Sequence, residues 1–175
     1  MTVEQKGIFR FQNQDVTIIG RDLKAGEKAP DFVAQNMDWQ VIRPLEQTEG
    51  KVRIIGSLPS LSTSVCDREA RRFNQEAVGL GEDVVIFMVS MDLPFTLKNW
   101  CGMAGIDRVV PLSDHLTGEF GEKFGVLIKE ARVFRRAIFV VDRQGTIAYA
   151  AYMPVLGEEP NYEAVLEYAR KALQQ

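Results

Sequence analysis

The stretch KVRIIGSLPSLSTSVCDREARRFNQ, residues 51–75, has the pattern of a strand followed directly by a helix. Residues 51–58 are an apolar-rich run that ends at Pro59, which is typical of a strand buried in the centre of a sheet. Ser62 to Ser64 are candidate N-caps for a helix over about 65–79. The apolar face of that helix consists of Ala70, Phe73 and Ala77. The stretch therefore predicts a central strand that leads into a helix covering the sheet.

Strand and helix patterns continue to alternate toward the C-terminus. DVVIFMVS (83–90) predicts a second buried strand, and MDLPFTLKNWCGMAG (91–105) predicts a helix with Pro94 in its first turn and Gly105 at its end. A strand, a helix, a hairpin and an amphipathic helix follow: DRVVPL (107–112), GEFGEKFG (118–125), RAIFVVDRQGTIAYAAYM (136–153) and NYEAVLEYARKALQQ (161–175). This alternation is typical of an α/β fold.

The N-terminal part adds a separate feature. IFRFQNQDVTIIG (8–20) has two alternating runs around Asn13–Asp15, which predicts a β-hairpin. GEKAPDFVAQNMDWQVIRPL (26–45) predicts a further strand near Phe32 and a loop. Together the elements predict one domain over residues 1–175, an α/β sandwich with a central mixed sheet flanked by helices and an N-terminal hairpin.

Composition excludes several classes of function. The chain has 175 residues, of which 46% are hydrophobic and 26% charged, and its net charge is −3. These values are those of a globular protein and do not indicate binding to nucleic acid or to an anionic membrane. No apolar run approaches the roughly 20 residues of a membrane span. The start, MTVEQKGIFRFQNQD, lacks the apolar core of a secretory signal, so we expect a cytoplasmic protein.

The cysteine and histidine content limits the chemistry. Two cysteines, Cys66 and Cys101, do not make a disulfide framework in a chain of this length. With one histidine and no closely spaced cysteine pair, metal binding is poorly supported, and we expect no cofactor. His115, in PLSDHLTGEF, is interpreted as a surface or turn residue. The chemistry that remains for the two cysteines is redox or nucleophilic catalysis.

Cys66 lies where a thiolate would be stabilised. It falls in the first turn of the predicted helix, where unpaired N–H groups and the positive end of the helix dipole favour an anion. Thr63 lies three residues earlier, within reach of the sulfur, and Pro59 removes a donor and shields one side. The alternative is that Cys66 is a small buried residue, which free cysteines usually are. These features alone leave both readings open.

Three separated motifs resemble one family. The arrangement Pro59-x-x-x-Thr63-x-x-Cys66 resembles the active-site loop of the peroxiredoxins. PSLSTSVCDREARRFN and SMDLPFTLKNWCG are similar to segments of the thiol peroxidase subgroup, and RRAIFVVD is similar to the family's Arg-Ala-hydrophobic-Asp segment. With the hairpin and GEKAPDF, the resemblance covers nearly the whole chain and implies a thioredoxin-like fold. One departure is Ser62, where the subgroup commonly has Asp.

The resemblance implies roles for four residues in the reaction of Cys66 with peroxide. Cys66 would attack the O–O bond of a hydroperoxide and become a sulfenic acid. Thr63 would hydrogen-bond the sulfur and the peroxide oxygens, Pro59 would shield the site, and Arg136 would hold charge near both. In the family's Arg-Ala segment the arginine directly precedes the alanine, so the resemblance selects Arg136 over Arg135. Strand alternation puts these two side chains on opposite faces.

The resemblance also assigns Cys101 and the partners. Cys101 would condense with the sulfenic acid to give an intramolecular disulfide, which thioredoxin would reduce; the alternative is a buried core cysteine. The family further implies a homodimer. Three other readings remain: a peroxiredoxin with one working cysteine and an external second thiol, a peroxide-sensing switch protein, and a binding module without chemistry.

Overall fold

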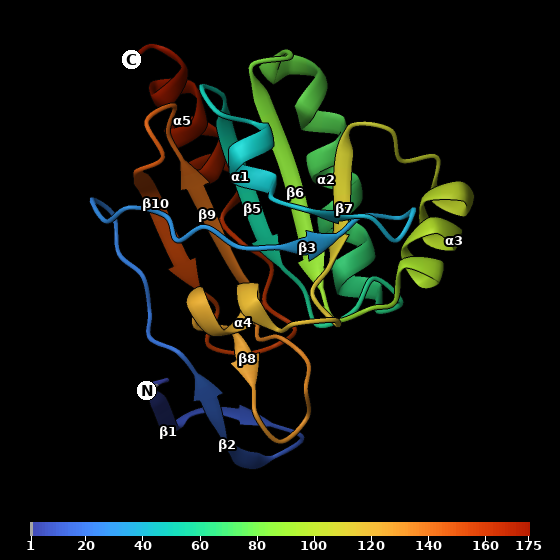
Figure 1. Ribbon diagram of the computed structural model, residues 1–175, viewed down its shortest axis with the longest axis vertical. Helices are drawn as coiled ribbons and strands as arrows, with labels where there is room; N and C mark the ends of the chain where they lie inside the picture. Colours follow the sequence, from blue (N-terminus) through green and yellow to red (C-terminus); the bar gives the residue numbers. More distant parts are fainter. Residues whose placement is uncertain (1) are drawn as a thin grey trace.

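The computed structural model describes residues 2–175, which form two sheets (Figure 1). The larger sheet has seven strands in the order β10-β9-β5-β6-β7-β3-β4. Their bounds are β3 (Ala34–Gln35), β4 (Val41–Ile42), β5 (Val52–Ser57), β6 (Val84–Ser90), β7 (Val109–Ser113), β9 (Ala137–Val141) and β10 (Ile147–Tyr152). β5, β6 and β7 are parallel, whereas the outer strands pair antiparallel. The predicted mixed sheet is confirmed.

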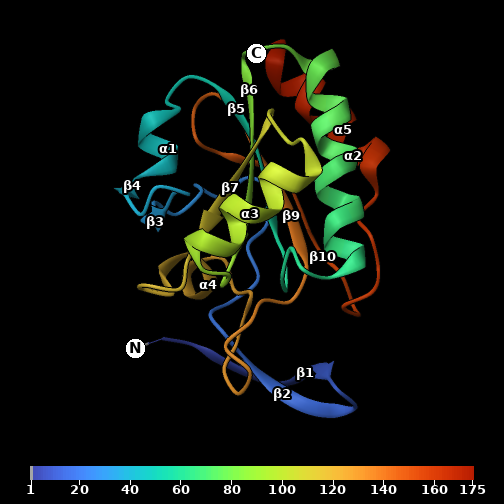
Figure 2. The ribbon, with the colours of Figure 1, turned by 90° about the vertical axis from the view of Figure 1, so that its right-hand side faces the viewer.

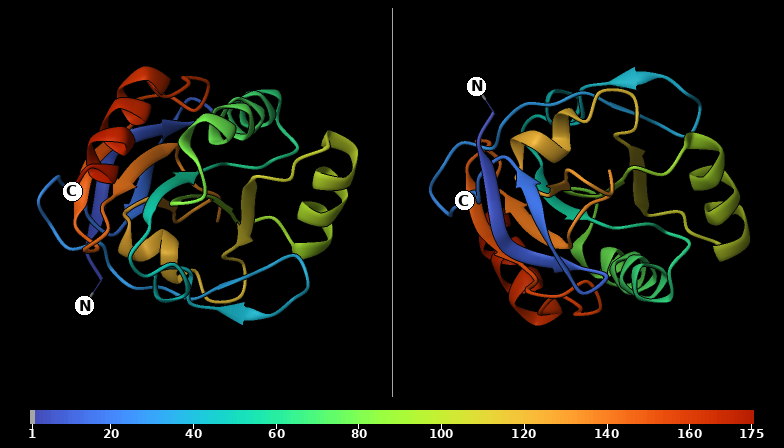
Figure 3. Two further views of the ribbon diagram at one scale, coloured as in Figure 1. Left: turned by 90° about the horizontal axis from the view of Figure 1, so that it is seen from above. Right: turned by 90° about the horizontal axis from the view of Figure 1, so that it is seen from below.

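Helices cover both faces of this sheet, which Figure 2 shows from its edge. α2 (Ser64–Leu80), α3 (Pro94–Ala104) and α5 (Tyr162–Leu173) pack into one apolar cluster with the sheet, and α1 (Pro44–Gln47) and α4 (Glu119–Lys123) pack into the cluster on the other face. Figure 3 shows the same layers along the vertical axis, with α2 and α3 as separate neighbouring helices. The predicted α/β sandwich is therefore confirmed.

The passage from β5 into α2 has the structure predicted for residues 51–75. All six residues of β5 are buried, and the strand lies between β6 and β9 in the sheet. Position 56 requires glycine, because a Cβ atom there would lie 2.6 Å from the sulfur of Met88. α2 begins at Ser64 and buries Ala70, Phe73 and Ala77 against the sheet. Since β5 is a central strand, the start of α2 lies near the middle of the sheet, at the end where β5 terminates.

The N-terminal hairpin forms a second, smaller sheet. β1 (Glu4–Phe11) and β2 (Gln14–Ile19) pair antiparallel, and β8 (Leu127–Ile128) joins β2. β1 begins four residues before the predicted start at residue 8. The reason is a bulge between Lys6 and Phe9, where Gly7 has a φ of +71° and interrupts the alternation that the sequence pattern relies on.

Other differences concern short or irregular segments. α1 and β8 are too short to give a periodic pattern and were not among the predicted elements. The strand expected near Phe32 is instead β3, two residues later. The Phe32 ring is fully buried and packs against Phe120 and Phe124, at centroid distances of 4.9 and 5.5 Å. Tertiary packing, rather than strand pairing, therefore explains the apolar character of this segment. No helix within residues 2–175 is long and apolar enough to cross a membrane.

His115 lies in the turn after β7, as predicted, but not on the open surface. The residue is half-buried, and its ring meets Trp39 edge-on at 5.9 Å. Its Nε2 atom is buried and has no hydrogen-bond partner among the described residues. The aromatic contact accounts for this burial, which a polar surrounding sequence does not reveal.

Candidate active site

Cys66 is fully buried in the first turn of α2. Thr63 is the N-cap residue, and its hydroxyl accepts a hydrogen bond from the Cys66 N–H at 3.4 Å. The same hydroxyl donates to the Ser60 carbonyl oxygen at 2.9 Å. Its one hydrogen is therefore used by the backbone, so the expected hydrogen bond from Thr63 to the sulfur is not present in this structure. Thr63 instead fixes the turn that carries the sulfur.

Arg136 supplies the positive charge at the sulfur. Its Nη2 atom donates to Cys66 Sγ at 3.4 Å, and its guanidinium is almost wholly buried. The Leu156 carbonyl oxygen accepts from Nε and Nη2 at 3.2 and 3.1 Å. Arg135 points the other way, to Asp22 and the Gly125 carbonyl, with its guanidinium over the ring of Tyr152. The expectation that only one of the two arginines faces Cys66 is confirmed.

Glu69 is a site residue that the sequence reasoning missed. Its Oε2 atom accepts from Arg136 Nη1 at 2.6 Å, and both side chains are buried. Burial raises the pKa of Glu69 to about 7, although the neighbouring Arg136 opposes this rise. Oε1 has no hydrogen-bond partner within residues 2–175. The available signal was spacing: Glu69 lies three residues after Cys66 and so shares its face of the helix.

An apolar pocket of about 400 Å³ opens onto Arg136. Pro59 and Thr63 line it, so the active-site loop forms one side of this pocket. The other walls come from separate parts of the chain: Phe11 at the tip of the hairpin, Val65, Val133 and Leu156. The hairpin therefore contributes to the approach to the site as well as to the fold, a role that its sequence pattern did not indicate.

Asp92 anchors the loop between β5 and α2. Its carboxylate accepts from Ser60 Oγ at 2.7 Å and from the Leu61 N–H at 2.9 Å. It also accepts from Ser90 Oγ at 2.8 Å, which ties the loop to the end of β6. Ser62 contacts Ser60 through their hydroxyl groups at 2.7 Å and is itself exposed. The loop geometry is thus held from β6, and Ser62 contributes only at its outer edge.

Cys101 lies in α3, apart from the group around Arg136. It is half-buried against the apolar cluster that contains Cys66, and both cysteines are free thiols. Burial raises the pKa of the Cys101 thiol. The structure therefore brings Pro59, Thr63, Cys66 and Arg136 together, and it holds Cys101 on the neighbouring helix.

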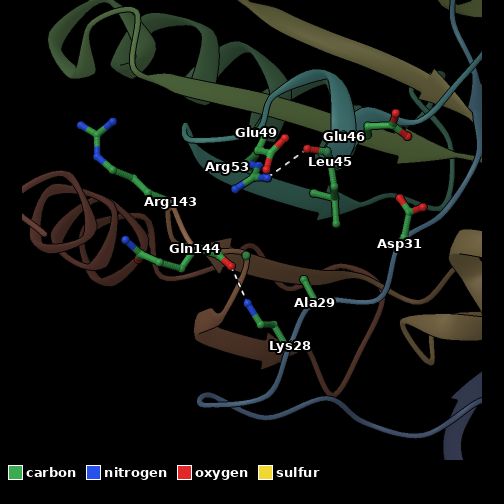
Figure 4. A pocket seen from close by; sticks show the side chains of 10 residues that line it. Lys28, Ala29, Asp31, Leu45, Glu46, Glu49, Arg53, Arg143 and Gln144 are labelled. Carbon is green, nitrogen blue, oxygen red and sulfur yellow. Dashed lines mark hydrogen bonds between the residues drawn. The ribbon is translucent and has the colours of Figure 1, made fainter.

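A slightly larger cavity, of about 450 Å³, lies at the other end of β5 (Figure 4). Its cationic groups already have partners: Lys28 donates to the Gln144 carbonyl oxygen, and Arg53 donates to the carbonyl oxygen of Leu45. Neither cysteine lines this cavity. The 400 Å³ pocket is the one connected to the reactive thiol, because Arg136 lines that pocket and donates to Cys66 Sγ.

Comparisons with known proteins agree with this geometry. Residues 25–150 match the AhpC/TSA family. A thiol peroxidase of Oceanobacillus iheyensis is 47% identical over 161 residues, 92% of this chain and 97% of that protein; a thiol peroxidase of Bacillus subtilis is 45% identical over 160 residues, 91% and 95%. The crystal structure of a peroxiredoxin-like protein from Aquifex aeolicus has a TM-score of 0.84 and 34% identity, covering 94% of this chain and 96% of that one. The chain therefore belongs to the AhpC/TSA family and, within the peroxiredoxins, to the thiol peroxidases, which reduce peroxides at a protein thiol.

Proposed function

We propose that the chain reduces hydrogen peroxide and organic hydroperoxides at Cys66, with Cys101 as the second thiol and thioredoxin as the reductant. The observation that carries this proposal is the hydrogen bond from Arg136 Nη2 to Cys66 Sγ at the start of α2. A buried guanidinium and a helix N-terminus both favour a thiolate at this sulfur. The thiolate is the form that attacks a peroxide.

The first step oxidises Cys66. The Cys66 thiolate attacks one oxygen of the hydroperoxide, the O–O bond breaks, and the other oxygen leaves with its electron pair and takes a proton to become water or an alcohol. Arg136 stabilises the sulfur and the negative charge that develops on the leaving oxygen. Glu69 holds the guanidinium in place through its bond to Nη1. The product is a sulfenic acid at Cys66.

The second step joins the two cysteines. The Cys101 thiolate attacks the sulfur of the sulfenic acid, the S–O bond breaks, and the oxygen leaves as water after protonation. Because burial raises the pKa of Cys101, its thiolate is disfavoured while α3 stays packed. Loosening of the helices exposes this thiol and also lets the sulfurs approach, which favours attack in an opened form. A thioredoxin dithiol then reduces the disulfide.

The pocket favours substrates with an apolar group. Its lining is mainly aliphatic and aromatic, and its volume of about 400 Å³ exceeds what hydrogen peroxide needs. We therefore propose that organic hydroperoxides react at least as fast as hydrogen peroxide. Initial rates with cumene hydroperoxide and with hydrogen peroxide, measured at equal concentrations below saturation, test this preference.

We also propose a homodimer and a cytoplasmic location. An exposed aromatic pair, Trp39 and Phe95 with ring centroids 4.8 Å apart, gives one apolar surface that a second copy would cover. A scattering mass of twice 19.7 kDa would support the dimer, and 19.7 kDa would refute it. Two free thiols are compatible with a reducing compartment.

The deciding experiment is peroxide consumption coupled to thioredoxin, thioredoxin reductase and NADPH. The parent should turn over continuously, and Cys66→Ser should not. Cys101→Ser should react once with peroxide but lose the thioredoxin-linked turnover. Full turnover of Cys101→Ser would favour one working cysteine with an external second thiol. A parent that oxidises once without turnover would favour a peroxide-sensing switch.

A further inference from the structure

A stripe of polar residues on α2 binds the segment that carries Cys101. Asp67, Arg71 and Asn74 are spaced by four and three residues, so they lie on one face of the helix. Asn74 Oδ1 accepts from the N–H groups of Arg108 and Val109, at 2.8 and 3.1 Å, just after α3. Arg71 Nη1 donates to a carbonyl oxygen at the end of α3, that of Ala104, at 3.2 Å. This face of α2 therefore holds α3 and its exit by hydrogen bonds.

The first residue of the stripe lies beside both cysteines in sequence. Trp100 Nε1 donates to Asp67 Oδ1 at 2.9 Å. Asp67 follows Cys66, and Trp100 precedes Cys101, so this bond joins the immediate neighbours of the two thiols. The other carboxylate oxygen of Asp67 accepts from Arg71 Nε at 2.8 Å. The carboxylate is thus held on both oxygens, and the indole has its single donor satisfied.

The position of Asp67 in the helix links this bond to the first turn. Its N–H donates to the Thr63 carbonyl oxygen at 3.0 Å, which closes the first turn around Cys66. Unwinding that turn moves the Asp67 backbone and strains or breaks the side-chain bond to Trp100. Trp100 is itself buried, at 8% exposure, so it cannot follow without leaving the apolar cluster.

We propose that the Trp100–Asp67 hydrogen bond is a latch that keeps the first turn of α2 and the Cys101 segment closed, and so limits the rate at which Cys66 and Cys101 join. This inference rests on the disulfide step proposed above. Asp67 and Trp100 are positioning residues, because the hydrogen bonds of their side chains go to each other and to Arg71 rather than to the Cys66 sulfur or the Arg136 guanidinium. The latch acts after the peroxide step and leaves that step unchanged.

The latch also sets how long the sulfenic acid persists. While the site stays closed, a second hydroperoxide can oxidise the Cys66 sulfenic acid to a sulfinic acid; the peroxide O–O bond breaks, one oxygen is transferred to sulfur, and water or alcohol leaves. Disulfide formation competes with this second oxidation. A weaker latch should therefore give faster disulfide formation and less sulfinic acid at a given peroxide concentration.

The test separates the two steps by rapid acid quench. Thiol, sulfenic acid trapped with dimedone, and disulfide are counted by mass spectrometry at each time. Trp100→Phe keeps a ring but removes the N–H donor, and we expect disulfide formation to speed up roughly fivefold, about 1 kcal/mol in the barrier. The second-order rate of the peroxide step should stay within a factor of two. Glu76→Gln, which removes an ion pair with Arg72 on the same helix, is the matched control and should change neither rate.

A second variant guards against misfolding of Trp100→Phe. Asp67→Ala leaves the indole ring in place, removes the acceptor, and should also speed disulfide formation. If both residues act through one bond, the double variant should be no faster than the faster single variant. Unchanged or slower disulfide formation in the folded single variants, or additive effects, would overturn the latch. Absence of any Cys66–Cys101 disulfide in the parent would instead overturn the proposed function on which the latch rests.

Discussion

At the scale of single residues, the site depends on which of two adjacent arginines faces the sulfur. Alternation along the chain predicts that Arg135 and Arg136 point apart, and the structure has Arg136 at 3.4 Å from Cys66 Sγ. Spacing places Glu69 on the face of α2 that carries Cys66, but it does not identify Arg136 as the partner of this glutamate. A glutamate on a helix is usually solvent-facing, and only the tertiary structure shows that this one is buried opposite a guanidinium.

Arg136→Lys tests the planar donor group at the sulfur. Lysine keeps the charge but cannot bond Cys66, Glu69 and the Leu156 carbonyl together, so we expect the second-order rate with peroxide to fall tenfold or more, about 1.4 kcal/mol in the barrier. Arg135→Lys is the matched change on the opposite face and should leave this rate nearly unchanged. Stopped-flow measurement with each variant decides, and equal losses at both positions would mean that charge in the region matters rather than Arg136.

Glu69→Gln tests the buried carboxylate through pH. Its pKa is raised from 4.5 to about 7 in the folded protein, so the folded state retains a proton that the unfolded chain releases. The stability contribution of this group is therefore fully present below about pH 4.5 and is lost as pH rises through about 7. Urea unfolding should show the parent losing free energy of unfolding over this window more steeply than Glu69→Gln. Glu163→Gln, an exposed change on α5, should follow the parent. Parallel curves for parent and Glu69→Gln would contradict the assignment.

At the scale of elements, the β5–α2 unit was predictable and the short elements were not. The run over 51–58, the cap at Thr63 and the helical face beyond it are local patterns, and each is found in the structure. β8, by contrast, has two residues and exists because β2 lies beside it. The apolar pocket was equally unpredictable, because its walls come from the hairpin, the active-site loop and residues near Leu156.

Thr63→Val tests the cap on the first turn of α2. Valine has nearly the same shape but cannot accept from the Cys66 N–H, so we expect a loss of about 1 kcal/mol in the free energy of unfolding. Because Cys66 lies in this turn, the rate with peroxide should fall as well. Thr63→Ser keeps the hydroxyl and should retain both properties. If Val and Ser variants behave alike in urea unfolding and stopped-flow assays, the hydroxyl is not what fixes the turn.

At the scale of the whole molecule, we propose that the reduced protein rearranges before Cys66 and Cys101 form their disulfide. Cys66 and Cys101 are free thiols on α2 and α3, and a disulfide needs Cα atoms within about 7 Å. Asp67 accepts a hydrogen bond from Trp100, and Arg71 donates one to the Ala104 carbonyl oxygen; these two bonds hold the helices in the closed arrangement. The resemblance seen in the sequence implies which cysteines pair, but it does not reveal these contacts, since they depend on the packing of α3.

Oxidation with one equivalent of peroxide should give an intramolecular Cys66–Cys101 disulfide. We expect faster amide hydrogen exchange over the first turn of α2 and around Trp100–Gly102 in the oxidised form, because both segments leave their packed positions. Peptide mapping and hydrogen exchange on both redox forms measure this, with the exchange of β9 as an internal reference. A disulfide between chains, or unchanged exchange at both segments, would indicate a different second thiol or a preformed pair.

The most direct measurement is the location of the sulfenic acid. In Cys101→Ser, one equivalent of hydroperoxide in the presence of dimedone should give one adduct per chain, and peptide mass spectrometry should find it at Cys66. In the parallel Cys66→Ser protein, which retains Cys101, any dimedone adduct should form far more slowly than the adduct at Cys66. An adduct at Cys101 in the Cys66→Ser protein, formed as fast as the one at Cys66, would contradict the claim that Cys66 is the peroxide-reacting thiol.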